Sequence, residues 1–225
     1  MLAGHYAPAY LLRGRFPRVS LLTFFLAVQA PDIVFFLLVP LGIEHVRVDP
    51  SVRGPLGMEL VSIPYTHSLA LTLVYGAAII AACRFLGRGW GLGAALAIAV
   101  VSHWAVDYIV HVHDLPLAPE SGVRLGLGLW TYSAAAYALE VTMVVGAAIW
   151  LARTLPPGRA RHWIYASAVV LVLSQTNYVL TPPPATTTRL AINAELTYAF
   201  MALIAWACDR AIARAEQRRP VTASV

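Results

Sequence analysis

Three histidines and two aspartates fall within one stretch of thirteen residues, SHWAVDYIVHVHD, at positions 102 to 114. His103, Asp107 and His111 are spaced four residues apart, which places them along one face of a helix. An ionised carboxylate near the centre of a bilayer costs on the order of 3 kcal/mol, so such residues usually face a cavity and mark function. Because the surrounding region is strongly apolar, this stripe predicts a polar site inside a membrane-spanning helix.

Other apolar segments contribute groups of the same kind: Asp32 in QAPDIVFF, His67 in PYTHSLAL and Glu140 in YALEVTMV. Asp32 lies beside Pro31, where an interrupted helix frees backbone groups that protein or water must satisfy. Mixed imidazole and carboxylate ligands suit zinc, iron or manganese, whereas an all-oxygen shell would suit magnesium or calcium. We therefore predict a divalent transition-metal centre, with zinc as the first expectation and iron or manganese as alternatives.

Such a centre predicts hydrolysis, because a bound metal lowers the pKa of its water toward 7 and polarises the bond under attack. A carboxylate or histidine that is not a ligand can serve as general base, and Glu140 and His113 are the candidates for that catalytic role. Two other interpretations stay open. His103 and Asp107 can form a mutually satisfied pair without a metal, and histidines at the membrane boundary can simply be hydrated.

The composition predicts the elements that position these residues. The chain has 225 residues, of which 59% are hydrophobic and 12% charged, against about 25% charged in soluble domains. Apolar runs long enough to cross a bilayer as helices predict an all-α, polytopic membrane bundle. The six spans are expected at residues 19–43, 66–86, 90–112, 129–152, 160–181 and 190–213. We expect one membrane domain, with the metal site in about 1–152, two further helices in about 160–213 and a basic tail at 214–225.

The basic residues predict the orientation of the bundle. All sixteen are arginines, and with a cytoplasmic N-terminus twelve fall on the inside, as the positive-inside rule requires. Only Arg47, Arg53, Arg124 and Arg189 fall outside. We therefore expect both termini in the cytoplasm and the chain in the inner membrane. The net charge of +5 needs no nucleic acid as partner, and the basic tail is expected to touch anionic lipid.

The motifs GHY, APD, THSL and SHWAVD, followed by the passage from DLPL to LGLGLW, occur in this order along the chain. Over roughly residues 4 to 152 the chain resembles the YdjM-type membrane-bound metal-dependent hydrolase family. The resemblance implies a helical membrane protein whose metal ligands are His5, Asp32, His67, His103 and Asp107. The HVHD sequence after the third span departs from the family and adds His111 as a candidate ligand, with a second ion as an option.

His5 precedes the first span on the predicted inner side, whereas the other ligands lie toward the outside. Either HYAPAYLLRGRF forms a short helix that dips into the membrane, or the orientation is reversed, or His5 is not a ligand. We favour the dipping helix. We also expect QTNY, residues 175 to 178, to line the same cavity from the fifth span.

The leading functional prediction is a metal-dependent hydrolase that acts on a lipid-like or amphiphilic ester or phosphoester, because such molecules reach an intramembrane cleft laterally. A metal-ion or proton-coupled transporter is the alternative, although the inverted repeats common among transporters are not visible. A haem protein with paired axial histidines is a third class, which the accompanying aspartates disfavour. The sequence leaves open the bond cleaved, the number of ions and the oligomeric state.

Overall fold

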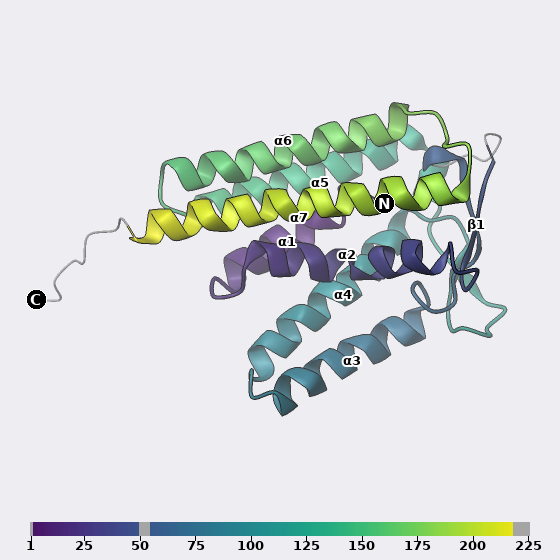
Figure 1. Ribbon diagram of the computed structural model, residues 1–225, viewed down its shortest axis with the longest axis horizontal. Helices are drawn as coiled ribbons and strands as arrows, with labels where there is room; N and C mark the ends of the chain where they lie inside the picture. Colours follow the sequence, from purple (N-terminus) through teal and green to yellow (C-terminus); the bar gives the residue numbers. More distant parts are fainter. Residues whose placement is uncertain (1, 50–54, 218–225) are drawn as a thin grey trace, which may run out of the picture.

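The computed structural model describes residues 2–49 and 55–217, and over this part the chain is a bundle of α-helices (Figure 1). The helices are α1 (Tyr6–Arg15), α2 (Leu21–Leu38), α3 (Leu69–Phe85), α4 (Trp90–Val110), α5 (Ser133–Thr154), α6 (Arg159–Leu180) and α7 (Thr187–Gln217). Two short antiparallel pairs complete the fold, β1 (His45–Val48) with β2 (Met58–Ser62) and β3 (Leu115–Pro116) with β4 (Arg124–Leu125). Single turns of 3-10 helix, η1 (Pro55–Gly57) and η2 (Leu129–Thr131), precede β2 and α5. The predicted all-α membrane bundle is confirmed.

Five of these helices, α2, α4, α5, α6 and α7, are long and apolar enough to cross a membrane. The remaining predicted span, 66–86, corresponds to α3, an apolar helix of 17 residues, whose length is about 25 Å at 1.5 Å per residue. Each predicted span therefore coincides with one helix. The predicted tail falls partly on the end of α7 at Gln217, and its remainder, from residue 218, lies outside the described residues.

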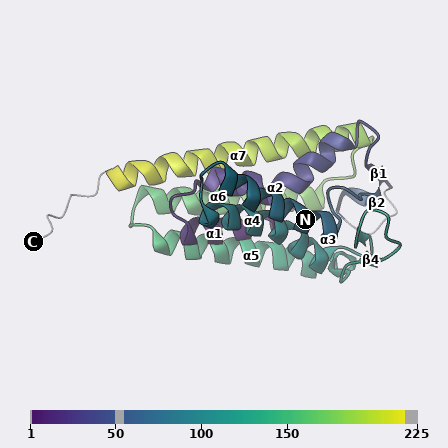
Figure 2. The ribbon, with the colours of Figure 1, turned by 90° about the horizontal axis from the view of Figure 1, so that it is seen from below.

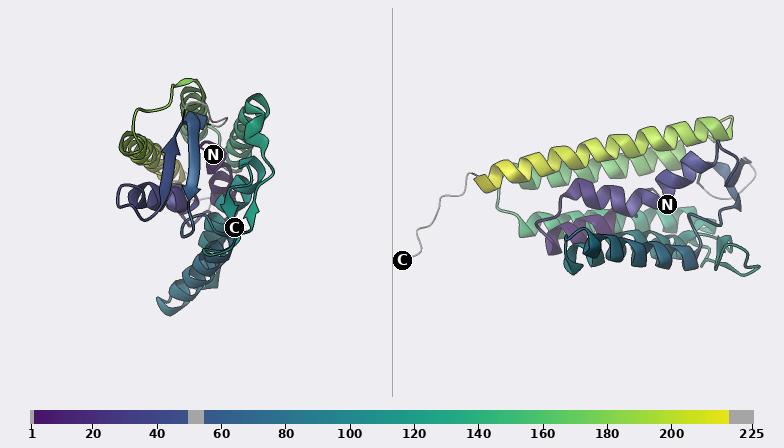
Figure 3. Two further views of the ribbon diagram at one scale, coloured as in Figure 1. Left: turned by 90° about the vertical axis from the view of Figure 1, so that its right-hand side faces the viewer. Right: turned by 60° about the horizontal axis from the view of Figure 1, so that its bottom comes forward.

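The helices form layers along one long axis. In Figure 1, α1 and α2 lie between the α3–α4 hairpin and the group formed by α5, α6 and α7, and the views in Figure 3 agree. Figure 2 shows β1, β2 and β4 gathered at one end of the bundle, with the end of α7 at the other. The loops that were expected on the outside therefore share one end of the molecule.

Helix α1 is an additional, buried element. It packs against α2 and α5, and Ala3, Tyr6, Ala9 and Tyr10 are at most 1% exposed. The hydroxyl of Tyr10 makes a hydrogen bond of 2.7 Å with Ser167 Oγ on α6. The short helix expected for HYAPAYLLRGRF is thus present and enters the bundle, with its first residues in the core.

The start of α2 is fixed by caps from two sources. Asp209 on α7 accepts hydrogen bonds from the amides of Leu21 and Leu22 at 2.8 and 2.9 Å, and Ser20 accepts one from Thr23 at 3.0 Å. A carboxylate at a helix N-terminus satisfies amides that lack an intrahelical partner and complements the helix dipole. These contacts set the position of α2, which carries Asp32.

Candidate metal centre

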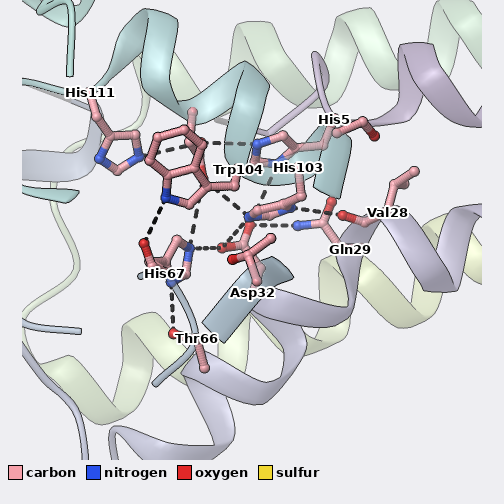
Figure 4. Close-up of polar contacts among 12 residues, drawn as sticks. His5, Val28, Gln29, Asp32, Thr66, His67, His103, Trp104 and His111 are labelled. Carbon is pink, nitrogen blue, oxygen red and sulfur yellow. Dashed lines mark hydrogen bonds and ion pairs between the residues drawn. The ribbon is translucent and has the colours of Figure 1, made fainter. Parts of the chain in front are cut away.

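Six polar side chains meet in the core, from four parts of the fold (Figure 4). They come from the N-terminal end of α1, from α2, from the loop before α3 and from the last turns of α4, and none is more than 9% exposed: His5, Asp32, His67, His103, Asp107 and His111. Two triads have ligand atoms that all lie within 4.8 Å of one another, His5–His103–Asp107 and Asp32–His67–His103. All six sequence-predicted ligands are therefore brought together.

Asp107 is the centre of this cluster. Its Oδ1 lies 2.9 Å from His5 Nε2 and 3.3 Å from His111 Nε2. Its Oδ2 lies 3.1 Å from His103 Nε2 and 3.7 Å from His67 Nε2. The two carboxylate oxygens thus face two different pairs of imidazoles.

Asp32 presents Oδ1 to two imidazoles, while its Oδ2 lies 3.8 Å from His5 Nδ1. Its Oδ1 lies 3.2 Å from His67 Nε2 and 3.6 Å from His103 Nε2. Its Oδ2 accepts hydrogen bonds from Gln29 Nε2 at 2.6 Å and from the Tyr198 hydroxyl at 3.2 Å. Protein donors therefore hold the carboxylate so that Oδ1 stays directed at the cluster.

In His67, His103 and His111 the Nδ1 nitrogen lies within hydrogen-bond distance of an oxygen atom. His103 Nδ1 lies 2.7 Å from the carbonyl oxygen of Val28, in the turn of α2 that precedes Pro31. A carbonyl can only accept, so Nδ1 carries the proton. His111 Nδ1 lies 3.0 Å from Asp114 Oδ1, and an ionised carboxylate likewise accepts.

His67 is oriented by a chain of two hydrogen bonds. The hydroxyl of Thr66 donates its one proton to Glu44 Oε2 at 2.5 Å, and it lies 2.7 Å from His67 Nδ1. Since that proton is used, Thr66 accepts from Nδ1–H. The indole of Trp104 also donates to the His67 carbonyl at 2.9 Å, which ties this loop to α4.

These bonds leave the Nε2 lone pairs of neutral imidazoles directed at carboxylate oxygens. His103 Nε2 is buried and makes no hydrogen bond within the described part of the chain, although Asp107 Oδ2 is only 3.1 Å away. A lone pair facing a carboxylate repels it, and a cation between them removes the conflict. Ligand atoms around a tetrahedral zinc with bonds of about 2.1 Å lie about 3.4 Å apart, close to the distances found here.

Protonation of the histidines is the competing way to satisfy the carboxylates. The rings of His5 and His103 are stacked, with centroids 3.7 Å apart, so two imidazolium charges there would repel each other. If the imidazoles are neutral, the ionised carboxylates of Asp32 and Asp107 leave two negative charges in the cluster. One divalent ion neutralises them. The residues present therefore fit a divalent transition metal. A histidine that binds a metal typically donates its other ring N–H to an oxygen acceptor, as His67, His103 and His111 do here.

A cavity of about 740 Å³ adjoins the cluster, and Asp32, His67 and His111 form part of its wall. It runs between α6 and α7, where Asn177 and Tyr178 line it. The expectation that the QTNY segment lines the cavity is confirmed for these two residues. The site therefore draws on the helices after residue 153 as well as on residues 1–152.

The two candidate bases occupy different surroundings. Glu140 is buried, and its Oε2 accepts hydrogen bonds from the amides of Leu2 and Gly4, both at 3.2 Å. These contacts hold the segment that leads into His5. His113 is exposed in the turn after α4, and the structure does not bring its side chain to the cluster.

Several supporting residues were missed by sequence reasoning. Gln29, Thr66 and Asp114 sit three, one and three residues from the ligands they orient, and this local spacing is the signal that could have identified them. Glu44 and Tyr198 lie far from those ligands in sequence, and nothing in the chain's pattern indicates them.

Comparisons with family models, with curated proteins and with solved structures find no match to this chain. The resemblance to the YdjM-type family therefore stays a prediction.

Proposed function

We propose that the protein is a metal-dependent hydrolase of the membrane, acting on a lipid-like or amphiphilic ester or phosphoester. The observation that carries this proposal is the arrangement of His67, His103 and His111, whose Nε2 atoms face two carboxylates while oxygen acceptors hold their Nδ1 atoms. Zinc is the first choice of metal, with iron or manganese as alternatives, because the donors are imidazole and carboxylate.

The ligands would be drawn from His5, Asp32, His67, His103, Asp107 and His111, with a coordination position left for water. The chemistry that a divalent ion supplies in such a site is activation of water for attack and polarisation of the bond under attack. Asp32 and Asp107 balance the positive charge, and Gln29 and Tyr198 keep Asp32 in place. Asp32, His67 and His111 line the cavity, so the cluster is accessible from it.

The surroundings of the cluster support an amphiphilic substrate. The cavity lies between helices that are long and apolar enough to span a membrane, and most of its wall is apolar, including Phe35, Leu173 and Phe200. A molecule dissolved in the bilayer could enter between α6 and α7 without crossing water. The arginine distribution supports an inner-membrane protein with both termini in the cytoplasm.

Metal content of the detergent-purified protein tests the proposal. After incubation with zinc and removal of free ion, the native chain should retain stoichiometric metal, and His103→Ala should lose it. His162→Ala is the matched control, because His162 is an exposed histidine on α6 and should change nothing. Retention of no ion by the native chain, or equal retention by His103→Ala, would overturn the proposal.

Transport is the alternative function, and the same proteins distinguish it. Uptake of the metal into proteoliposomes at a rate that depends on His103 would favour a transporter. Hydrolysis of an amphiphilic ester without uptake supports the hydrolase.

A further inference from the structure

We propose that the cavity between α6 and α7 binds one acyl chain of a membrane lipid, with the uncharged, hydroxyl- or amide-bearing headgroup of that lipid at its outer end. The role of this lipid as substrate rests on the proposed function, whereas its binding does not. The metal cluster alone determines neither the path of the acyl chain nor the chemistry of the headgroup.

The depth of the cavity matches one leaflet of a bilayer. Its lining extends along α6 to Val170 and along α7 to Phe200, ten and thirteen residues from the connection between Leu180 and Thr187. At 1.5 Å per residue these distances are about 15 and 20 Å. Half of a hydrocarbon core of about 30 Å is about 15 Å, so the cavity reaches the bilayer centre from one side.

The polarity of the lining changes along this path. Toward the α6–α7 connection the wall includes Asn177, Thr181 and Asn193, together with two prolines of the connection and Leu190, and farther from it Leu173, Leu196 and Phe200 are among the apolar residues of the lining. Carboxamides both donate and accept hydrogen bonds, so they suit hydroxyl or amide groups. A polar end followed by an apolar length is the shape of a single-chain amphiphile.

Apart from an ion at the ligand cluster, the charge of the lining favours an uncharged headgroup over a strongly anionic one. None of the described residues in the cavity wall is an arginine, and the chain contains no lysine. The ionisable groups there are Asp32, His67, His111 and two tyrosines. Outside the ligand cluster the wall therefore offers hydrogen bonds and no cation.

The cavity also accounts for access to the cluster. Asp32, His67 and His111 belong to the same wall as the apolar residues of α6 and α7, so a lipid in this position has its polar part beside the ligands. The volume of about 740 Å³ lies within the range of about 300–1,000 Å³ found for small-molecule pockets. One chain, rather than a complete two-chain lipid, is the occupant that this space suits.

Photocrosslinking tests the path of the acyl chain through the cavity. The probe is a monoacylglycerol with a diazirine near the end of its chain, added to metal-free protein in lipid nanodiscs, with labelled peptides identified by mass spectrometry. We expect labelling of α6 and α7 at the cavity. Leu196→Trp should lower it about tenfold, the effect of about 1.4 kcal/mol of lost binding free energy.

Leu203→Trp is the matched control. Leu196 and Leu203 lie on the same helix and are 64% and 63% exposed, but only Leu196 lines the cavity. Equal loss of labelling in both variants, or labels spread evenly over the lipid-facing helices, would overturn the proposal.

Competition tests the headgroup. An unlabelled monoacylglycerol should displace the probe better than a lysophosphatidic acid with the same chain, and Asn177→Leu combined with Asn193→Leu should abolish this preference. Equal competition by the two lipids in the native protein would contradict the assignment of an uncharged headgroup.

These outcomes are separate from those of the metal experiment. Labelling is measured on metal-free protein and again on His103→Ala, while the metal content of Leu196→Trp should equal that of the native chain. Specific labelling without metal retention would leave the lipid site and remove the hydrolase. Metal retention without specific labelling would remove the lipid site and leave the proposed hydrolase.

Discussion

His67 is held by a relay that starts at a carboxylate in the loop after α2. Glu44 is fully buried and accepts hydrogen bonds from the amides of Tyr65 and Thr66 as well as from the Thr66 hydroxyl. Thr66 in turn fixes which nitrogen of His67 carries the proton. Residues that orient a metal ligand in this way typically change metal affinity about 10–100-fold when they are removed.

Thr66→Val keeps the size of the side chain and removes both hydrogen bonds of its hydroxyl. We expect metal affinity to fall about 10–100-fold, measured by competition with a metal indicator of known affinity. Thr131→Val is the control, because the Thr131 hydroxyl is exposed and bonds only to the carbonyl of Gly128 among the described residues. An unchanged affinity in Thr66→Val would show that the relay does not orient His67.

The contacts of Glu140 give it a positioning role for the N-terminal segment. Glu140→Gln keeps an oxygen that can accept from Leu2 and Gly4 while it removes the carboxylate. We expect Glu140→Gln to retain metal and hydrolysis. Glu140→Leu should lose stability, because each unsatisfied buried amide costs about 1–3 kcal/mol.

The readouts for Glu140 are metal content, activity and thermal unfolding in detergent. Loss of hydrolysis in Glu140→Gln with full metal content would instead assign Glu140 as the general base predicted from the sequence. A positioning role for Glu140 therefore predicts that Glu140→Gln keeps hydrolysis, and a role as general base predicts that it loses hydrolysis.

The residues of the cluster could be predicted because their types are costly in a membrane. His103 and Asp107 share a helix face by spacing alone, and Asp32 and His67 stand out in apolar surroundings. The partner of Glu140 could not be predicted, since a backbone amide leaves no mark in the sequence.

At the scale of elements, the α3–α4 hairpin sets the distance between His67 and the ligands of α4. The two helices approach closely at Gly93, where an added Cβ would lie 3.0 Å from the Cα of Ile80. Any larger side chain there must push α3 away. The loop that carries His67 would move with it.

Gly93→Val should destabilise the protein by about 1–3 kcal/mol, the usual cost of overpacking, and should lower metal retention. In thermal unfolding each kcal/mol corresponds to about 2–4 °C for a chain of this size. Gly91→Val is the control, since an added Cβ at Gly91 meets nothing within 4 Å. Equal unfolding midpoints would contradict the close approach of the two helices.

The other element that matters is α1, a short helix that was expected from the family resemblance and not from composition. Its ten residues, YAPAYLLRGR, are too few to span a bilayer and carry two arginines, so composition gives no membrane signal. Only the resemblance of GHY to a family motif required His5 to reach the site. Its burial depends on contacts with α2 and α5, which are distant in sequence.

At the scale of the whole molecule, the proposed orientation places the β1–β2 and β3–β4 pairs outside and the α5–α6 connection inside. Single cysteines test this, because Cys83 and Cys208 are both buried and should not react. Gly122→Cys lies in the loop between β3 and β4, and Pro157→Cys lies in the exposed α5–α6 connection.

In intact cells freed of their outer membrane, an impermeant maleimide should label Gly122→Cys at once and Pro157→Cys only after permeabilisation. The reverse pattern would invert the orientation. Labelling of both positions from outside would contradict the even number of spans.

The cluster meets the cavity along the wall formed by Asp32, His67 and His111. An ion that left through this wall would cross the space assigned to the lipid. Exchange of bound for free ion should therefore slow as the lipid concentration rises, with a longer half-life for isotopic replacement of the metal. In the cell, the order of events would then be fixed: the ion is acquired first, and the lipid afterwards traps it.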